Sequence, residues 1–133
     1  MINAHGWINI FIDDDNEIDN ESHDRFFEEI KPAISDFNKY PNQFIELKKM
    51  NVSEVYYIGL AHNHSSSYLN DLIALYKTIA EKAPLSYGLL HVYDDEDSTY
   101  FNKYRVFRLA KGTLTEHEDT LLSPYFPTIE DPS

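Results

Sequence analysis

The spacing of hydrophobic and polar residues changes from one segment of the chain to the next. Residues 4–12 alternate imperfectly and are rich in Trp, Ile and Phe, a pattern typical of a strand with one buried face. Spacings of three and four residues, which are typical of an amphipathic helix, begin at Ser22 and again near residue 67. The pattern therefore predicts a first strand, a polar loop over residues 13–22 and two helices further along the chain.

The first helix is predicted from Ser22 onward and contains a proline. Its apolar stripe consists of Phe26, Ile30, Ala33, Ile34 and Phe37. Proline removes a backbone donor and clashes with the preceding helical turn. We therefore expect either a kink at Pro32 or a new helix that begins near it.

The second helix has the clearest periodicity in the chain. Serine hydroxyls at positions 65–67 can cap its start, Asp71 places a negative charge near that end, and Pro84 ends it. The apolar positions are Leu69, Leu72, Ile73, Tyr76, Ile79, Ala80 and Ala83. This pattern predicts a helix over residues 67–83.

Four further segments are predicted to be strands. Residues 44–50 and 55–62 are separated by a short turn and should pair as an antiparallel hairpin. Residues 85–93 and 100–110 follow the second helix and are joined by the loop 94–99. The order β-α-β-β-α-β-β indicates an α+β fold with a mostly antiparallel sheet of four or more strands and both helices on one face.

The length of the chain and the absence of an internal repeat or linker indicate one domain over residues 1–133. The prolines of the last segment predict an irregular tail, residues 113–133, laid over the domain. Aromatic-rich strands more often belong to a core than to a contact surface. We therefore expect Trp7, Ile10 and Tyr87 to be largely buried.

The net charge of −12 is concentrated at the two ends of the chain. Residues 1–24 contain seven acidic and no basic residues, residues 25–111 contain eleven of each, and residues 112–133 contain five acidic and no basic ones. This charge repels phosphate backbones and anionic lipids, so we expect no binding to nucleic acid or to membranes. It would attract a basic partner, although acidic ends can also serve only to keep a small domain soluble.

Residue types and spacing exclude several kinds of active site. The chain has no cysteine, which excludes disulfides, thiol nucleophiles and cysteine-ligated metal. Its four glycines lie at least 24 residues apart, which excludes the usual phosphate-binding loops and the serine-hydrolase elbow. We therefore expect no enzymatic activity and no required cofactor. Because the first residues form neither a basic region nor a hydrophobic stretch, we also expect a cytoplasmic protein.

The histidines leave one alternative function open. His62 and His64 are two residues apart and would project from the same face of a strand, while His91 lies close in sequence to Asp94. Two imidazoles beside a carboxylate can bind a metal ion, so a small metal-dependent enzyme is the alternative. In the simpler interpretation, both histidines are exposed or hydrogen-bonded at the end of a strand.

Two acidic clusters are candidate contacts for a basic partner. The first, which we call the acidic loop, consists of Asp94, Asp95, Glu96 and Asp97. Aromatic residues, Tyr93, Tyr100 and Phe101, flank it in the sequence, and acidic groups beside aromatic anchors are typical of protein interfaces. The second cluster consists of Asp13, Asp14, Asp15 and Glu17. Asp13, Asp15, Glu17 and Asp19 also alternate like the ligands of a calcium-binding loop. The segment lacks the glycine and the final glutamate that an EF-hand requires, because Ile18 and Asp24 occupy those positions.

Several short motifs follow one another along nearly the whole chain. They are His5-Gly6-Trp7, Tyr87-Gly88-Leu89-Leu90, Asp94-Asp95-Glu96, Tyr104-Arg105-Val106-Phe107-Arg108, Gly112, Leu122-Ser123-Pro124 and Pro127-Thr128-Ile129-Glu130-Asp131. In this order they resemble the immunity protein 7 family of bacterial polymorphic-toxin systems. The resemblance implies a non-enzymatic antidote that is made beside a toxin and binds the toxic domain. Many such toxins are nucleases with basic surfaces, to which an acidic protein would be steered electrostatically.

Overall fold

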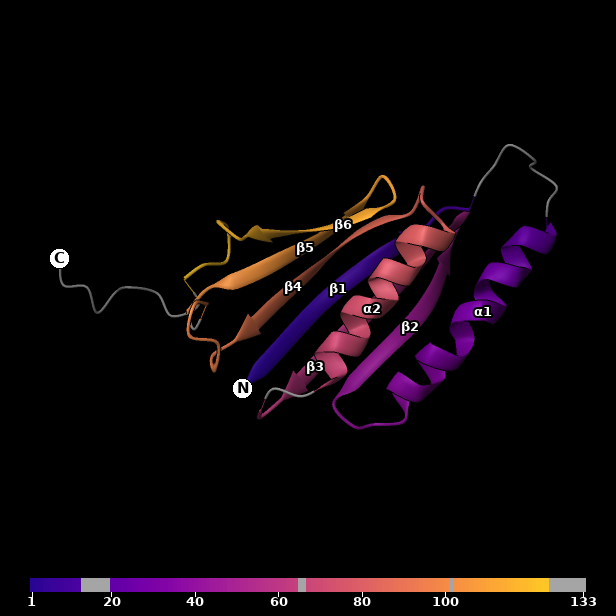
Figure 1. The fold of residues 1–133 in the computed structure, drawn as a ribbon. Coiled ribbons are helices and arrows are strands. Elements are labelled where there is room, and N and C mark those ends of the chain that lie inside the picture. Colours follow the sequence, from indigo (N-terminus) through magenta and orange to yellow (C-terminus); the bar gives the residue numbers. More distant parts are fainter. Residues whose placement is uncertain (13–19, 65–66, 101, 125–133) are drawn as a thin grey trace.

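The computed structural model of the 133-residue chain describes residues 1–12, 20–64, 67–100 and 102–124 (Figure 1). These residues form the elements β1 (Ile2–Ile10), α1 (Asn20–Asn38), β2 (Gln43–Met50), β3 (Ser53–His62), α2 (Ser67–Lys82), β4 (Tyr87–Asp94), β5 (Tyr104–Ala110) and β6 (Thr113–Glu118). The strands form one sheet in the order β2-β3-β1-β4-β5-β6, and every neighbouring pair is antiparallel. The predicted α+β class and order of elements are confirmed, and β6 follows as a further strand.

Both helices lie on the same face of the sheet, as predicted, and the core lies between the two layers (Figure 1). In β1 the even-numbered residues Ile2, Ala4, Ile8 and Ile10 point into this core. Tyr76 of α2 is fully buried among them. Alternation along β1 therefore separates a covered face, under the helices, from an opposite face of the sheet.

Helix α1 continues through Pro32, so the predicted restart does not occur. Pro32 removes the donor that would bind the carbonyl group of Glu28, four residues earlier. Both residues lie on the exposed side of α1, where water can satisfy that carbonyl group. Ala33, which we assigned to the apolar stripe, is exposed as well.

The prediction of an irregular tail from residue 113 is wrong for its first part, because Thr113–Glu118 form β6. The turn before β6 consists of Lys111 and Gly112, which both have positive φ angles, 55° and 74°. Two such residues form the tight turn that suits the twist of a hairpin. The side chains of β6 are mostly exposed, so the strand lacks the hydrophobic pattern that would have revealed it.

Ile10 is buried as predicted, but the prediction is wrong for Trp7 and Tyr87. Trp7 is half-buried and Tyr87 is 46% exposed, and the two rings contact each other edge to face with centroids 5.9 Å apart. Both residues lie on the sheet face opposite the helices, because they occupy the outward positions of β1 and β4. None of the described helices is long and apolar enough to span a membrane.

Candidate partner-binding site

The acidic loop lies at the end of the sheet where three central strands meet. Because β1 runs antiparallel to both of its neighbours, Ile2 lies opposite His62 of β3 and opposite Asp94 of β4. The beginning of the chain, the end of β3 and the loop after β4 are therefore adjacent. Residues distant in the sequence, such as His64 and Glu96, come into contact here.

Two of the four acidic side chains hold the backbone of the acidic loop. Asp94 Oδ1 accepts a hydrogen bond from the backbone N–H of Glu96 at 3.0 Å. Asp97 Oδ1 accepts hydrogen bonds from the backbone N–H groups of Thr99 and Tyr100 at 2.8 and 3.2 Å. Such side-chain-to-backbone bonds stabilise turns. Asp94 and Asp97 therefore have a structural role that the sequence alone did not indicate.

The other two acidic side chains form the exposed tip of the loop. Asp95 Oδ1 lies 2.7 Å from the amino nitrogen of Met1, and this hydrogen bond raises the pKa of the Met1 ammonium group. Glu96 Oε2 lies 2.9 Å from Nδ1 of His64. Asp95 and Glu96 remain 42% and 45% exposed, so both carboxylates can still face a partner.

The aromatic residues beside the acidic loop do not all serve as surface anchors. Tyr93 is buried and packs against Tyr104, with ring centroids 5.6 Å apart. Tyr100 is half-buried under the guanidinium group of Arg105. Phe101 lies outside the described residues, and so does the second acidic cluster, which consists of Asp13, Asp14, Asp15 and Glu17.

The histidines proposed as metal ligands are not brought together. His62 points to the covered side of the sheet, where its Nε2 atom lies 2.7 Å from Oε1 of Gln43 and its ring packs against Tyr68. His64 binds Glu96 beyond the end of the strand, and His91 lies on the opposite face of β4. Among the described residues, no three His, Cys, Asp or Glu side chains are close enough to hold a metal ion.

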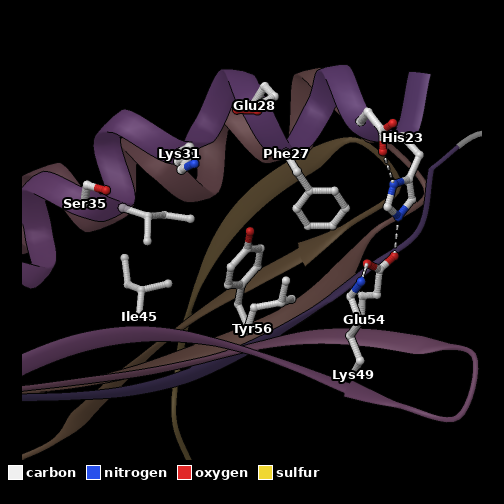
Figure 2. A pocket seen from close by; sticks show the side chains of 12 residues that line it. His23, Phe27, Glu28, Lys31, Ser35, Ile45, Lys49, Glu54 and Tyr56 are labelled. Atoms are coloured by element: carbon white, nitrogen blue, oxygen red, sulfur yellow. Dashed lines mark hydrogen bonds and ion pairs between the residues drawn. The ribbon is translucent and has the colours of Figure 1, made fainter. Parts of the chain in front are cut away.

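A hollow of about 540 Å³ lies between α1 and the β2–β3 hairpin (Figure 2). Figure 2 shows Phe27 and Tyr56 facing each other inside it, with His23 and Glu54 at one end. Its wall is both apolar and charged: His23, Asp24, Phe27, Glu28, Lys31, Ile34, Ser35, Ile45, Leu47, Lys49, Glu54 and Tyr56.

His23 and Glu54 join α1 to β3 at the end of this hollow. Nε2 of His23 lies 2.6 Å from Oε1 of Glu54, and Nδ1 lies 3.4 Å from Oδ1 of Asp24. These carboxylates, Glu54 above all, raise the pKa of His23. Burial, with a smaller contribution from Glu54, raises the pKa of Tyr56 to about 12. Both ring nitrogens of His23 already face carboxylates, so neither is available to activate a nucleophile. The contact between His23 and Glu54 therefore acts as a structural link between α1 and β3.

The sheet face opposite the helices is the second surface with a distinctive composition, and we call it the open face. Its central aromatic residues are Phe44 of β2, Tyr57 of β3, Trp7 of β1 and Tyr87 of β4. The aromatic character of their strands predicts that Trp7 and Tyr87 lie in the core. A signal for the correct assignment was present, because Ile8 and Ile10 share one face of β1 and so place Trp7 on the other.

Comparison with known proteins covers nearly the whole chain. A family model described as Immunity protein 7 matches residues 1–131. No curated protein and no solved structure shows a significant match. The matched range includes every element of the fold, the acidic loop and the strands of the open face.

Proposed function

The chain belongs to the Immunity protein 7 family, and we propose that it binds and thereby neutralises the toxic domain of a cognate toxin from a polymorphic-toxin system. The family match over residues 1–131 carries this proposal. The family implies a role in toxin immunity that is not enzymatic. Blocking a toxin requires only a stable complex, for which a rigid sheet with an exposed charged loop is a suitable scaffold.

We further propose that the acidic loop contacts the toxin. Asp95 and Glu96 form its exposed tip, while Asp94 and Asp97 hold the tip in one conformation, so little ordering is needed on binding. A toxin that cleaves nucleic acid must hold phosphates and therefore has a basic surface. The net charge of −12 would steer such a domain toward this protein in the cytoplasm. Asp13, Asp14, Asp15 and Glu17 are a second proposed contact.

The test compares two charge-reversed variants that change the net charge equally. The first, D95K/E96K, reverses the loop tip and leaves Asp94 and Asp97 in place to hold the turn. The second, D36K/E81K, reverses two exposed acidic residues on the helices. The affinity and the association rate for the toxin domain encoded beside the gene are measured at low and at moderate salt, and thermal melting confirms folding.

Both variants should associate more slowly at low salt, because long-range steering depends mainly on net charge. The D95K/E96K variant should in addition dissociate faster and lose about tenfold or more in affinity at moderate salt, because charge pairs at close range act on dissociation. Equal affinities for both variants at moderate salt would show that the loop is only a solvated hairpin tip. A wild-type protein that does not bind the toxin domain would refute the proposed function itself.

A further inference from the structure

The open face presents an aromatic centre on a rigid support. Register places Trp7 directly between Tyr57 of β3 and Leu89 of β4. Phe44 lies on the next strand, and its ring covers the space above Gly59, where a Cβ atom would lie 2.4 Å from the ring. Phe44, Tyr57 and Tyr87 all remain more than a third exposed. Large aromatic surface left in water is unusual unless a partner covers it.

Hydrogen bonds and ring contacts hold these side chains in place before any partner binds. The side-chain amide of Asn9 donates a hydrogen bond to the hydroxyl of Tyr87 at 3.0 Å. Tyr87 in turn packs edge to face against Trp7. Tryptophan and tyrosine residues that are fixed in this way lose little conformational entropy on binding, and they are the side chains most often found at the energetic centre of an interface.

We propose that the open face is the docking surface for the toxin domain, with Trp7, Tyr57 and Tyr87 at its centre and the acidic loop at its rim. The inference rests on the proposed function and adds the place of contact. Tyr87 begins β4 and the acidic loop follows the end of the same strand, so the loop lies at one end of the open face. An apolar aromatic centre with a charged rim is the usual composition of a specific protein interface.

The size of the open face fits a complex between proteins. Six strands spaced about 4.8 Å apart, with eight residues each on average, span roughly 24 Å across the strands and about 26 Å along them. The face thus covers about 600 Å², and the rim adds to it. Stable protein complexes bury about 800 Å² on each partner, so the face and its rim together are large enough for one.

The charge of the protein indicates which kind of partner the open face binds. Each copy of this chain carries a net charge of −12, so the approach of two copies is opposed by long-range repulsion. An open antiparallel sheet with aromatic residues can also stack the bases of single-stranded RNA. The lysine and arginine residues on the described part of the face, however, are Lys48 and Arg108, and Lys48 already pairs with Glu46 at 2.9 Å. A protein domain with a basic surface around an apolar centre is the partner that fits.

The first test uses Trp7, which is the single tryptophan of the sequence. The protein is labelled with 5-fluorotryptophan, so that its fluorine spectrum contains one resonance from the open face, and unlabelled toxin domain is titrated in while calorimetry records binding. We expect the Trp7 resonance to shift and to lose its sensitivity to exchange from H₂O to D₂O. Binding that leaves the resonance unchanged would refute the open face as the docking surface but not the proposed function. An absence of binding would refute both.

The second test compares tyrosines with equal exposure on opposite sides of the sheet. Tyr87 and Tyr40 are both 46% exposed, and each packs against another aromatic ring, but Tyr40 lies on the side of the helices beside Tyr68. We expect Y87A and Y57A each to weaken toxin binding by about tenfold or more, and Y40A to change it less than about twofold. Thermal melting identifies any variant that fails to fold.

Equal effects of Y87A, Y57A and Y40A would overturn the proposal. Two further measurements test whether a second copy of this chain or single-stranded RNA binds the open face instead. Sedimentation of the protein alone should show a monomer, and titration with a single-stranded RNA oligonucleotide should leave the Trp7 resonance unchanged. A dimer that shields Trp7, or RNA binding that shifts its resonance, would assign the open face to that occupant instead and so contradict the proposal.

Discussion

Replacing Gly6 with alanine should destabilise the domain because α2 packs directly over this position. Gly6 points to the covered face of β1, and a Cβ atom there would lie 2.3 Å from the hydroxyl oxygen of Tyr76. It would also lie 2.8 Å from the carbonyl oxygen of Leu89 and 3.0 Å from Cδ1 of Leu90. Tyr76 is fully buried and donates a hydrogen bond to that same carbonyl group at 3.0 Å, so its ring has little freedom to move.

These contacts determine how much each substitution should lower the free energy of unfolding. Overpacking a core typically costs about 1–3 kcal/mol, and the better strand preference of alanine offsets roughly 0.5–1 kcal/mol of this. Gly6→Ala should therefore lower the free energy of unfolding by about 1–2 kcal/mol. Tyr76→Phe alone should lower it by about 1–2 kcal/mol, because the carbonyl group of Leu89 loses a partly buried hydrogen bond.

The double variant tests the reasoning, because Tyr76→Phe removes the atom nearest to the new methyl group. The two losses should not add, and the coupling free energy should be about 1 kcal/mol or more. Chemical denaturation of the wild type, both single variants and the double variant measures this cycle. Losses that add within about 0.5 kcal/mol would show that the hydroxyl of Tyr76 is not what excludes a side chain at Gly6.

Gly59→Ala is a matched control, because it places a Cβ atom almost equally close to a neighbouring ring that is free to move. A Cβ atom at Gly59 would lie 2.4 Å from the ring of Phe44, a distance almost as short as at Gly6. Phe44 is exposed on the open face, however, so its ring can move aside. Gly59→Ala should therefore lower the free energy of unfolding by less than about 1 kcal/mol. A loss at Gly59 as large as at Gly6 would contradict this explanation.

Three further predictions follow from single contacts. Leu72→Ala in α2 should lower the free energy of unfolding by about 2–5 kcal/mol, measured by chemical denaturation, because Leu72 is buried in the core. The folded-state pKa of His23 is raised, so its pair with Glu54 should stabilise the protein fully below pH 6.5 and lose this effect as pH rises through the folded pKa. The free energy of unfolding of the wild type and of H23Q is measured against pH, and the difference between them should shrink as the pH rises. Because the pair is partly exposed, this difference should stay within about 1 kcal/mol. Asp119 accepts hydrogen bonds from the backbone N–H of Leu122 and the hydroxyl of Ser123, so Asp119→Ala should speed proteolysis of residues 119–124. Unchanged proteolysis would contradict the last prediction.

Elements with a strong local pattern were predicted closely. The helix predicted over residues 67–83 is observed as Ser67–Lys82, and the hairpin predicted from residues 44–50 and 55–62 is observed as Gln43–Met50 and Ser53–His62. In each case one face of the element is buried, so hydrophobic residues recur in the sequence at the spacing of a strand or of a helix. The strand β6 has no buried face and leaves no such trace.

The roles of individual side chains were harder to predict. All residues of the acidic loop have similar chemistry, yet Asp94 and Asp97 bind backbone N–H groups while Asp95 and Glu96 face solvent. The distinction depends on how the loop turns, which the composition of the loop does not specify. The link between His23 and Glu54 has no sequence signal, because the residues are 31 positions apart.

The sequence alone determined the order and type of most elements, the acidic charge and, through its motifs, the family, because periodicity, composition and short motifs are properties of the local chain. The tertiary structure decided which surfaces exist. Only the arrangement of both helices on one face leaves Trp7 and Tyr87 on the other, and only antiparallel pairing brings His64 to Glu96 and the acidic loop to the start of β1. Such contacts depend on strand register and on the packing of layers, in which residues far apart along the chain become neighbours.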